Sequence, residues 1–187
     1  MDTLVYLKTM LRDKNVASFT PTSAMGIKKV CSKINFKKRN VVIEYGPGTG
    51  VFTRYLLDHL SSDSVLILIE RNLDFVEILK QTFKDPRLYI YYDSAENVLE
   101  LLKKSKQSQA DYILSGIPFS FLPATLREDI IQKSYKCLRP NGKFLAYQTF
   151  FQMDRYLKTH LDESFSAVHT NFCFMNVPPM RLFEGIK

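Results

Sequence analysis

The stretch that most constrains the fold is VVIEYGPGTGVF at positions 41–52, where an apolar run meets three closely spaced glycines. An apolar run, a glycine turn and a helical pattern in this order are typical of a strand, a tight turn and a helix. Because glycine has no β-carbon, a turn built from Gly46, Gly48 and Gly50 lets a ligand approach the main chain closely. The motif therefore predicts a ligand-binding turn.

The chain after residue 40 alternates between apolar runs of strand type and helical patterns. The expected strands lie at residues 41–45, 65–70, 88–92, 111–116 and 143–149, and the expected helices at 24–34, 51–60, 73–83, 95–104, 123–138 and 153–162. This alternation favours a parallel sheet with helices on both faces. Two further apolar runs flank Pro178–Pro179 and predict an antiparallel hairpin at the sheet edge. We expect residues 41–187 to form one domain.

The positive charge of the protein is concentrated at its amino end. Residues 1–40 carry nine basic and two acidic side chains, a net charge of +7 that equals the formal charge of all 187 residues. Within them, Leu4, Leu7 and Leu11 fall on one face of a helix expected over residues 3–14. We therefore predict a basic amphipathic helical leader, which favours an anionic partner such as a lipid surface or a nucleic acid.

Other patterns in the sequence narrow the class of protein. The longest aliphatic run, VLILI at 65–69, is far shorter than a membrane span of about 20 residues requires, and the amino end does not resemble a secretory signal. The three cysteines are widely spaced without metal-binding patterns, so we expect reduced thiols, a cytoplasmic protein and no metal.

The glycine turn differs from two common kinds of nucleotide site. The Walker pattern GxxxxGK[ST] is absent, and the glycines form GxGxG rather than the GxGxxG of dinucleotide sites. One acid, Glu44, precedes the turn, and a second, Glu70, ends the next strand, where a carboxylate can accept hydrogen bonds from both ribose hydroxyls. A turn without a phosphate grip suits a nucleoside that carries an amino acid.

Acid-x-Gly-x-Gly-x-Gly followed by the later acid resembles the cofactor site of class I S-adenosylmethionine-dependent methyltransferases. The resemblance implies a Rossmann-like α/β fold, a mostly parallel seven-stranded sheet of order 3-2-1-4-5-7-6 that ends in an antiparallel hairpin. It implies S-adenosylmethionine as cofactor, S-adenosylhomocysteine as product and no metal. The implied cofactor-binding residues, with Glu70 at the ribose and Asp93 at the adenine, are Glu44, Tyr45, Gly46, Gly48, Gly50, Glu70, Arg71, Asp93, Ser94, Ala95 and Ser115.

The end of the fourth expected strand bears on the methyl acceptor. Methyltransferases that act on the amine of adenine carry Asn or Asp, an apolar residue, Pro and an aromatic residue there. This sequence has Ser115, Gly116, an isoleucine, Pro118 and Phe119, so glycine stands where the amide should be. As catalytic candidates, Ser115 and Gly116 are expected to present carbonyls to the acceptor nitrogen, and Pro118 and Phe119 to form one wall.

The sequence resembles soluble bacterial phosphatidylethanolamine (phospholipid) N-methyltransferases, in the segments SFTPTSAM, LSGIPFSFLP, LRPNGKFLAYQT and NVPPMRLFEG. This resemblance implies methylation of the amine of phosphatidylethanolamine at the inner face of the membrane. The leader would contact the anionic surface, and Tyr147 is a candidate cation–π partner of the methylated ammonium.

One alternative function is that of an rRNA or nucleic-acid adenine N6-methyltransferase, because the segment EYGPGTG is very like the corresponding segment of those enzymes. Another is a non-catalytic protein that binds S-adenosylmethionine.

Overall fold

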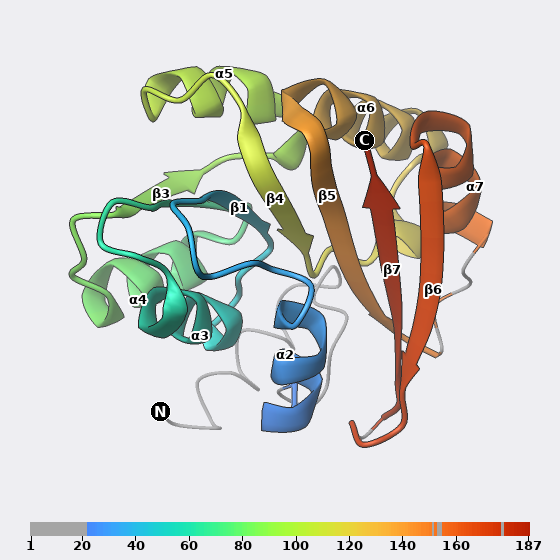
Figure 1. The fold of residues 1–187 in the computed structure, drawn as a ribbon, viewed down its shortest axis with the longest axis horizontal. Helices are drawn as coiled ribbons and strands as arrows, with labels where there is room; N and C mark the ends of the chain where they lie inside the picture. Colours follow the sequence, from blue (N-terminus) through green and yellow to red (C-terminus); the bar gives the residue numbers. More distant parts are fainter. Residues whose placement is uncertain (1–21, 151, 153–154, 177) are drawn as a thin grey trace.

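The computed structural model describes residues 22–150, 152, 155–176 and 178–187. Its centre is a seven-stranded sheet of order β3-β2-β1-β4-β5-β7-β6 (Figure 1). The strands are β1 (Val41–Tyr45), β2 (Val65–Glu70), β3 (Leu88–Tyr92), β4 (Ala110–Ser115), β5 (Leu138–Thr149), β6 (Ala167–Cys173) and β7 (Met180–Ile186). All pairs from β3 to β5 are parallel, and β7 is antiparallel to both β5 and β6. The strand order and the closing hairpin expected from the sequence are thereby confirmed.

Helices cover both faces of the sheet. They are α2 (Ala24–Cys31), α3 (Val51–His59), α4 (Leu73–Thr82), α5 (Val98–Lys104), α6 (Ala124–Cys137) and α7 (Arg155–Ser164), with short 3-10 turns η1 (Ala95–Asn97) and η2 (Phe119–Phe121). Apolar side chains of α2, α3 and α4 pack on one face, and those of α5, α6 and α7 pack on the other. Each strand contributes to both cores because successive side chains point to opposite faces.

Strand β1 shows how this alternation positions the groups at its end. Val41, Ile43 and Tyr45 belong to the core on the α6 side, whereas Val42 belongs to the core on the α3 side. The Tyr45 hydroxyl lies 3.0 Å from the Ser134 hydroxyl of α6, so the side chain of Tyr45 is held in the interior. The carboxylate of the intervening Glu44 therefore projects toward the opposite, α3 face.

Strand β5 begins earlier than its apolar pattern indicates. The pairing with β4 joins Ala110 to Leu138 and resumes at Tyr112 with Lys143, so residues 139–142 bulge out of the ladder. The turn-forming sequence RPNG fills this bulge, and Asn141 takes a positive φ of 60°. The turn predicted from the sequence is thus an irregularity inside a longer strand.

The first described helix is tied to the loop before β7. Ser23 caps α2 by accepting a hydrogen bond from the Gly26 N–H at 3.1 Å, and its own N–H donates to Asn176 Oδ1 at 2.7 Å. Ile27 and Val30 of α2 are buried in the α3-side core. The amphipathic helix expected over residues 3–14 lies outside the described residues. No helix in the described part of the chain is long and apolar enough to cross a bilayer.

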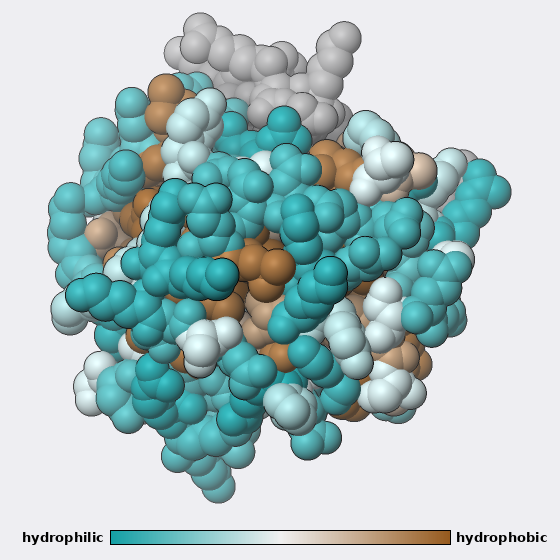
Figure 2. Space-filling view, turned by 90° about the horizontal axis from the view of Figure 1, so that it is seen from above, coloured by the Kyte–Doolittle hydropathy of each residue, from teal (hydrophilic) through white to brown (hydrophobic). Residues whose placement is uncertain are grey.

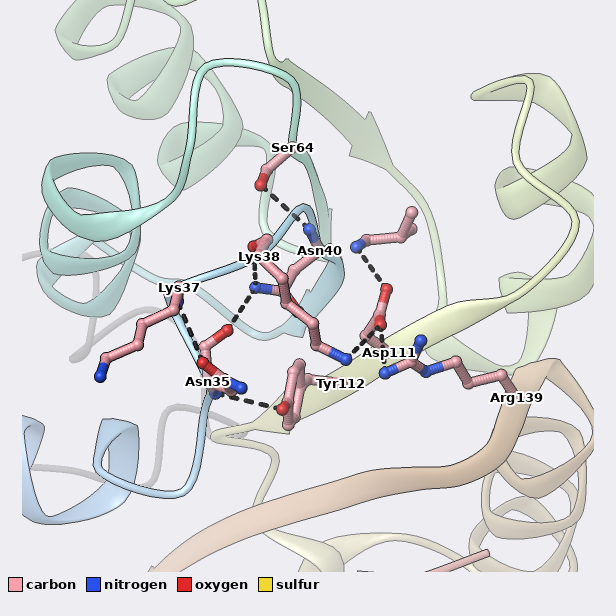
Figure 3. A network of polar contacts seen from close by, with 9 residues as sticks. Asn35, Lys37, Lys38, Asn40, Ser64, Asp111, Tyr112 and Arg139 are labelled. Atoms are coloured by element: carbon pink, nitrogen blue, oxygen red, sulfur yellow. Dashed lines mark hydrogen bonds and ion pairs between the residues drawn. The ribbon is translucent and has the colours of Figure 1, made fainter.

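A polar network closes the amino edge of the sheet, away from the glycine turn (Figure 3). Asp111 Oδ2 accepts the Val41 N–H at 2.8 Å, and Asp111 Oδ1 lies 2.7 Å from the Arg139 guanidinium and 3.7 Å from the Lys38 ammonium. Part of the positive charge of the leader is therefore neutralised at this edge. The view onto this end of the molecule is predominantly hydrophilic (Figure 2).

Candidate functional site

A pocket of about 270 Å³ opens at the carboxyl edge of the parallel strands. Its walls come from the glycine turn after β1, the ends of β2 and β3, the segment after β4, helix α6 and the end of β5. Ligands of open α/β sheets bind at this edge, where the loops that follow neighbouring strands converge. The charged side chains among the described residues of this lining are Glu70, Arg71 and Asp93.

The glycine turn forms the floor between β1 and α3. Gly46, Gly48 and Gly50 have φ values of 64°, 55° and 82°, a region that side chains rarely adopt. A β-carbon on Gly48 would meet no atom within 4 Å, whereas one on Gly50 would collide with the Phe83 ring and lie 2.9 Å from Leu79 Cδ2. Gly48 therefore leaves space for a ligand, and Gly50 allows α3 to pack against the end of α4.

Glu70 connects the glycine turn to the end of β2. Its Oε2 accepts the Gly48 N–H at 3.0 Å, and its Oε1 accepts the Asn72 N–H at 2.9 Å. The side chain is 8% exposed and lines the pocket. Its carboxylate is an acceptor of the kind that hydroxyl donors such as those of a ribose require.

The residues predicted at the adenine lie together at the end of β3. Asp93 Oδ1 accepts the Ser94 N–H and the Asn97 side-chain amide, both at 2.7 Å. The Asp93 N–H donates to the Glu70 carbonyl at 3.0 Å, which places the two acids on neighbouring loops. Asp93, Ser94 and Ala95 all line the pocket, and so does Arg71.

Four of the predicted cofactor residues, Glu44, Tyr45, Gly50 and Ser115, are not part of the pocket wall, and the first two lie beneath it. Glu44 is 1% exposed, and its Oε2 accepts the Thr53 hydroxyl at 2.8 Å. Its Oε1 meets no hydrogen-bond partner among the described residues. Burial raises the pKa of Glu44 to about 8, the charge of Glu70 adds to this, and the Thr53 hydrogen bond opposes it. Tyr45 reaches the site only through its carbonyl, which accepts the Gly116 N–H at 3.0 Å.

The residues after β4 divide between the pocket and the core. Gly116 and Pro118 line the pocket, whereas Ser115 and Phe119 are fully buried. Ser115 Oγ accepts the Ile117 N–H at 3.3 Å. Phe119 was expected to form a wall with Pro118, but the 3-10 turn η2 directs its ring into the α6-side core, with its centroid 6.4 Å from that of Phe144.

Further residues line the pocket that the sequence did not indicate. Asn72 and Phe75 come from the start of α4, Leu126 and Ile130 from α6, and two glutamines from the end of β5 and beyond. Residues of α6 carry no sequence signal, because only the packing of this helix against the sheet brings them to the pocket. For the glutamine in β5 the sequence did contain a signal, because the polar Gln148 stands near the end of the apolar run KFLAYQT.

Comparison with known proteins identifies the class of enzyme. Residues 21–137, more than half of the chain, match the family described as ribosomal RNA adenine dimethylase. The chain belongs to this family. It is an S-adenosylmethionine-dependent methyltransferase of the class I fold, as the glycine turn and the two strand-end acids indicated.

Two curated relatives differ in how much of their length is matched. The chain is 27% identical to an ornithine lipid N-methyltransferase of Singulisphaera acidiphila over 145 residues, which are 73% of this chain and 76% of the relative. It is 33% identical to ribosomal RNA small subunit methyltransferase A of Mycoplasma capricolum over 97 residues, which are 50% of this chain and 34% of the relative.

Solved structures share the fold at low sequence identity. Precorrin-6y C5,15-methyltransferase of Geobacter metallireducens has a TM-score of 0.74 at 13% identity, with 94% of this chain and 96% of that chain covered. Magnesium protoporphyrin IX methyltransferase of Synechocystis, solved with bound S-adenosylmethionine, has a TM-score of 0.65 at 9% identity, with 86% and 76% covered.

The chain's own residues fit this cofactor. The open space above Gly48 accepts a group in contact with the main chain, and Glu70 and Asp93 offer acceptors at adjacent strand ends. When bound, S-adenosylmethionine would supply an activated methyl group: a neutral amine that attacks this carbon forms an N–C bond as the C–S bond breaks, and S-adenosylhomocysteine leaves. The glycine turn would hold the amino-acid part, Glu70 the ribose and Asp93 the adenine amine.

The contrast between Gly48 and Gly50 yields a matched pair of variants. Both residues have positive φ, so alanine strains the backbone by about 1–2 kcal/mol at either position. Gly50→Ala also drives a methyl group into Phe83 and Leu79, and we expect a total loss of about 2–4 kcal/mol in denaturant unfolding. Gly48→Ala should keep most of the stability but weaken S-adenosylmethionine binding by calorimetry at least tenfold. Equal stability losses would contradict the assignment.

The buried Glu44 predicts a pH dependence of stability. Its pKa is raised from 4.5 to about 8, so the folded state binds a proton more tightly than the unfolded state. The resulting stabilisation is complete below pH 4.5 and is lost as pH rises towards 8. Glu44→Gln keeps an acceptor for Thr53 and removes this titration. The melting temperature of the variant minus that of the wild type should therefore increase by a few degrees between pH 6 and pH 8. If the melting temperatures of variant and wild type change in parallel with pH, Glu44 is not the titrating group. The control is Asp74→Asn, which removes an exposed acid.

Proposed function

We propose that the protein methylates the amine of a membrane lipid, of the phosphatidylethanolamine or ornithine lipid type. The observation that carries the proposal is the packing around Gly116. A β-carbon at this position would lie 2.5 Å from the Tyr147 hydroxyl and 3.3 Å from the Gly46 carbonyl. The Tyr147 ring is held by stacking on Phe52, with centroids 4.5 Å apart and planes at 26°.

This packing argues against adenine as the acceptor. Enzymes that methylate the adenine amine need an Asn or Asp side chain at this point to orient the amine. Tyr147 fills the space that such a side chain would occupy, so replacing Gly116 requires the stacked ring to move. The site therefore lacks the orienting group of the adenine enzymes, although the chain belongs to their family.

The extent of the matches also supports a lipid acceptor. The ornithine lipid enzyme is matched over 76% of its length, whereas the rRNA enzyme of Mycoplasma capricolum is matched over 34%. An adenine acceptor remains the second candidate because the family match spans residues 21–137 and the Pro118–Phe119 pair is present. A lipid amine differs from adenine because it is basic, and it must lose its proton before it can attack a methyl group.

An exposed aromatic cluster supports the proposed contact with a membrane. Phe150, Phe172 and Phe174, which we name the aromatic cluster, are 36%, 47% and 69% exposed. Their ring centroids lie 5.7–6.0 Å apart. The Arg181 guanidinium lies 5.4 Å from the Phe150 centroid and 6.0 Å from that of Phe172. Exposed aromatic rings beside a cation suit the boundary between acyl chains and anionic headgroups.

The aromatic cluster lies at the same edge of the sheet as the pocket. Phe150 follows Thr149, which lines the pocket and pairs with Met180, and Met180 also pairs with Cys173 in β6. We propose that this edge rests on the inner face of the membrane, with the exposed Lys28 and Lys29 of α2, within the basic leader of residues 1–40, adding attraction to anionic lipids. A lipid headgroup would then enter the pocket without leaving the interface.

The acceptor is tested by transfer of radiolabelled methyl groups from S-adenosylmethionine. The full chain is incubated with vesicles containing phosphatidylethanolamine, vesicles containing ornithine lipid, and 16S rRNA. We expect label in a lipid extract and in mono- or polymethylated amine headgroups. Label in adenine of the RNA, with none in either lipid, would replace the lipid proposal with the second candidate.

Membrane contact is tested by co-sedimentation with vesicles of phosphatidylglycerol and phosphatidylethanolamine. The double variant Phe172→Ser/Phe174→Ser removes two exposed rings, each worth about 1.5–3 kcal/mol when buried, so binding should fall at least tenfold. Tyr92→Ser removes an exposed ring outside the aromatic cluster, 59% exposed at the end of β3 on the same edge, and tests whether the loss is specific to the cluster. Raising the salt should weaken wild-type binding. Equal binding by wild type and double variant would exclude the aromatic cluster as the contact.

A further inference from the structure

Two glutamines in the pocket have polar atoms without hydrogen-bond partners among the described residues. Gln148 is 3% exposed, and neither its amide oxygen nor its amide nitrogen has a hydrogen-bond partner among the described residues. Gln152 is 7% exposed, and its amide oxygen is likewise unpartnered within the described part of the chain. Both residues line the pocket.

The position of Gln148 follows from the register of β5. Phe144 and Ala146 belong to the α6-side core, so Gln148, two residues further along, points to the same face. Ser115 ends β4 and pairs with Ala146, so Gln148 lies beyond the end of β4, at the open edge of the sheet. Ile130 of α6 lines the same pocket.

The surroundings make these unpaired groups costly. The pocket residues from β4 onward that accompany them include Ile117, Leu122 and Leu126, and the described lining carries its charges only on the cofactor side. A buried amide without partners destabilises the folded state, because it gives up water and gains nothing in return. A hydrophobic side chain of the same length would fill this position better, unless a ligand completes the hydrogen bonds.

We infer that Gln148 and Gln152 form an amine subsite that binds the acceptor nitrogen of the lipid headgroup. The two amide oxygens accept hydrogen bonds from the amine, and the amide nitrogen of Gln148 donates to a headgroup oxygen. This inference rests on the proposed function and names the residues that position its substrate.

The chemistry explains why amides rather than acids occupy this place. A carboxylate would stabilise the ammonium form of the acceptor and raise its pKa, which would keep its lone pair protonated. An amide oxygen orients an N–H by a hydrogen bond without a full counter-charge. The same neutral lining can accommodate the amine before and after a methyl group is added.

The experiment compares full-length wild type with Gln148→Met, Gln152→Met and the control Gln132→Met, which makes the same exchange on the exposed face of α6. Each protein is assayed for its melting temperature without ligand, its affinity for S-adenosylmethionine, and its KM and kcat with dihexanoyl phosphatidylethanolamine. Gln148→Met should raise the melting temperature by about 2–4 °C. Its KM for the lipid should increase at least tenfold, and its affinity for S-adenosylmethionine should stay within twofold.

The outcomes separate the inference from the proposed function. If wild type methylates the lipid and Gln148→Met does so with unchanged KM, the subsite is refuted while the lipid function stands. A melting temperature that falls in Gln148→Met shows that the amide is a structural group with partners, and this also overturns the inference. If wild type methylates no lipid amine, the proposed function itself fails. Gln132→Met should match wild type in every assay.

Discussion

A pair of main-chain hydrogen bonds to the Glu70 carboxylate holds the site together. One fixes the main chain of Gly48 and the other that of Asn72, so a single carboxylate joins the turn after β1 to the loop after β2. Because β1 and β2 are neighbouring parallel strands, these hydrogen bonds set the distance between the two loops that border the pocket. The pocket, the fit of the methyl donor and the placement of Asp93 all depend on this frame.

Most of the fold could be predicted from the sequence because the central strands are buried on both faces. The ranges expected for β1, β2 and β3 agree with the structure, since continuous apolar runs bounded by turns mark such strands clearly. The start of β5 could not be predicted, because residues 139–142 form a strong turn by sequence, and only pairing with β4 makes them a bulge.

The site was predictable where it depends on strand ends and not where it depends on packing. The places of Gly48, Glu70 and Asp93 in the pocket wall could be predicted, because each residue directly follows or ends a strand that the sequence marks clearly. Phe119 lies in the core because of a short 3-10 turn whose direction no local pattern specifies. Gln148 continues the buried face of β5, and the strand pattern alone did not mark this polar residue as buried.

The Asp111 network has a consequence for how such enzymes diversify. It ties together the starts of β1, β4 and β5 at the amino edge, whereas the candidate pocket lies at the carboxyl edge. Selection can therefore exchange residues around the acceptor while the anchoring end of the sheet stays intact. A change of methyl acceptor within this fold therefore needs substitutions at one rim of the sheet only.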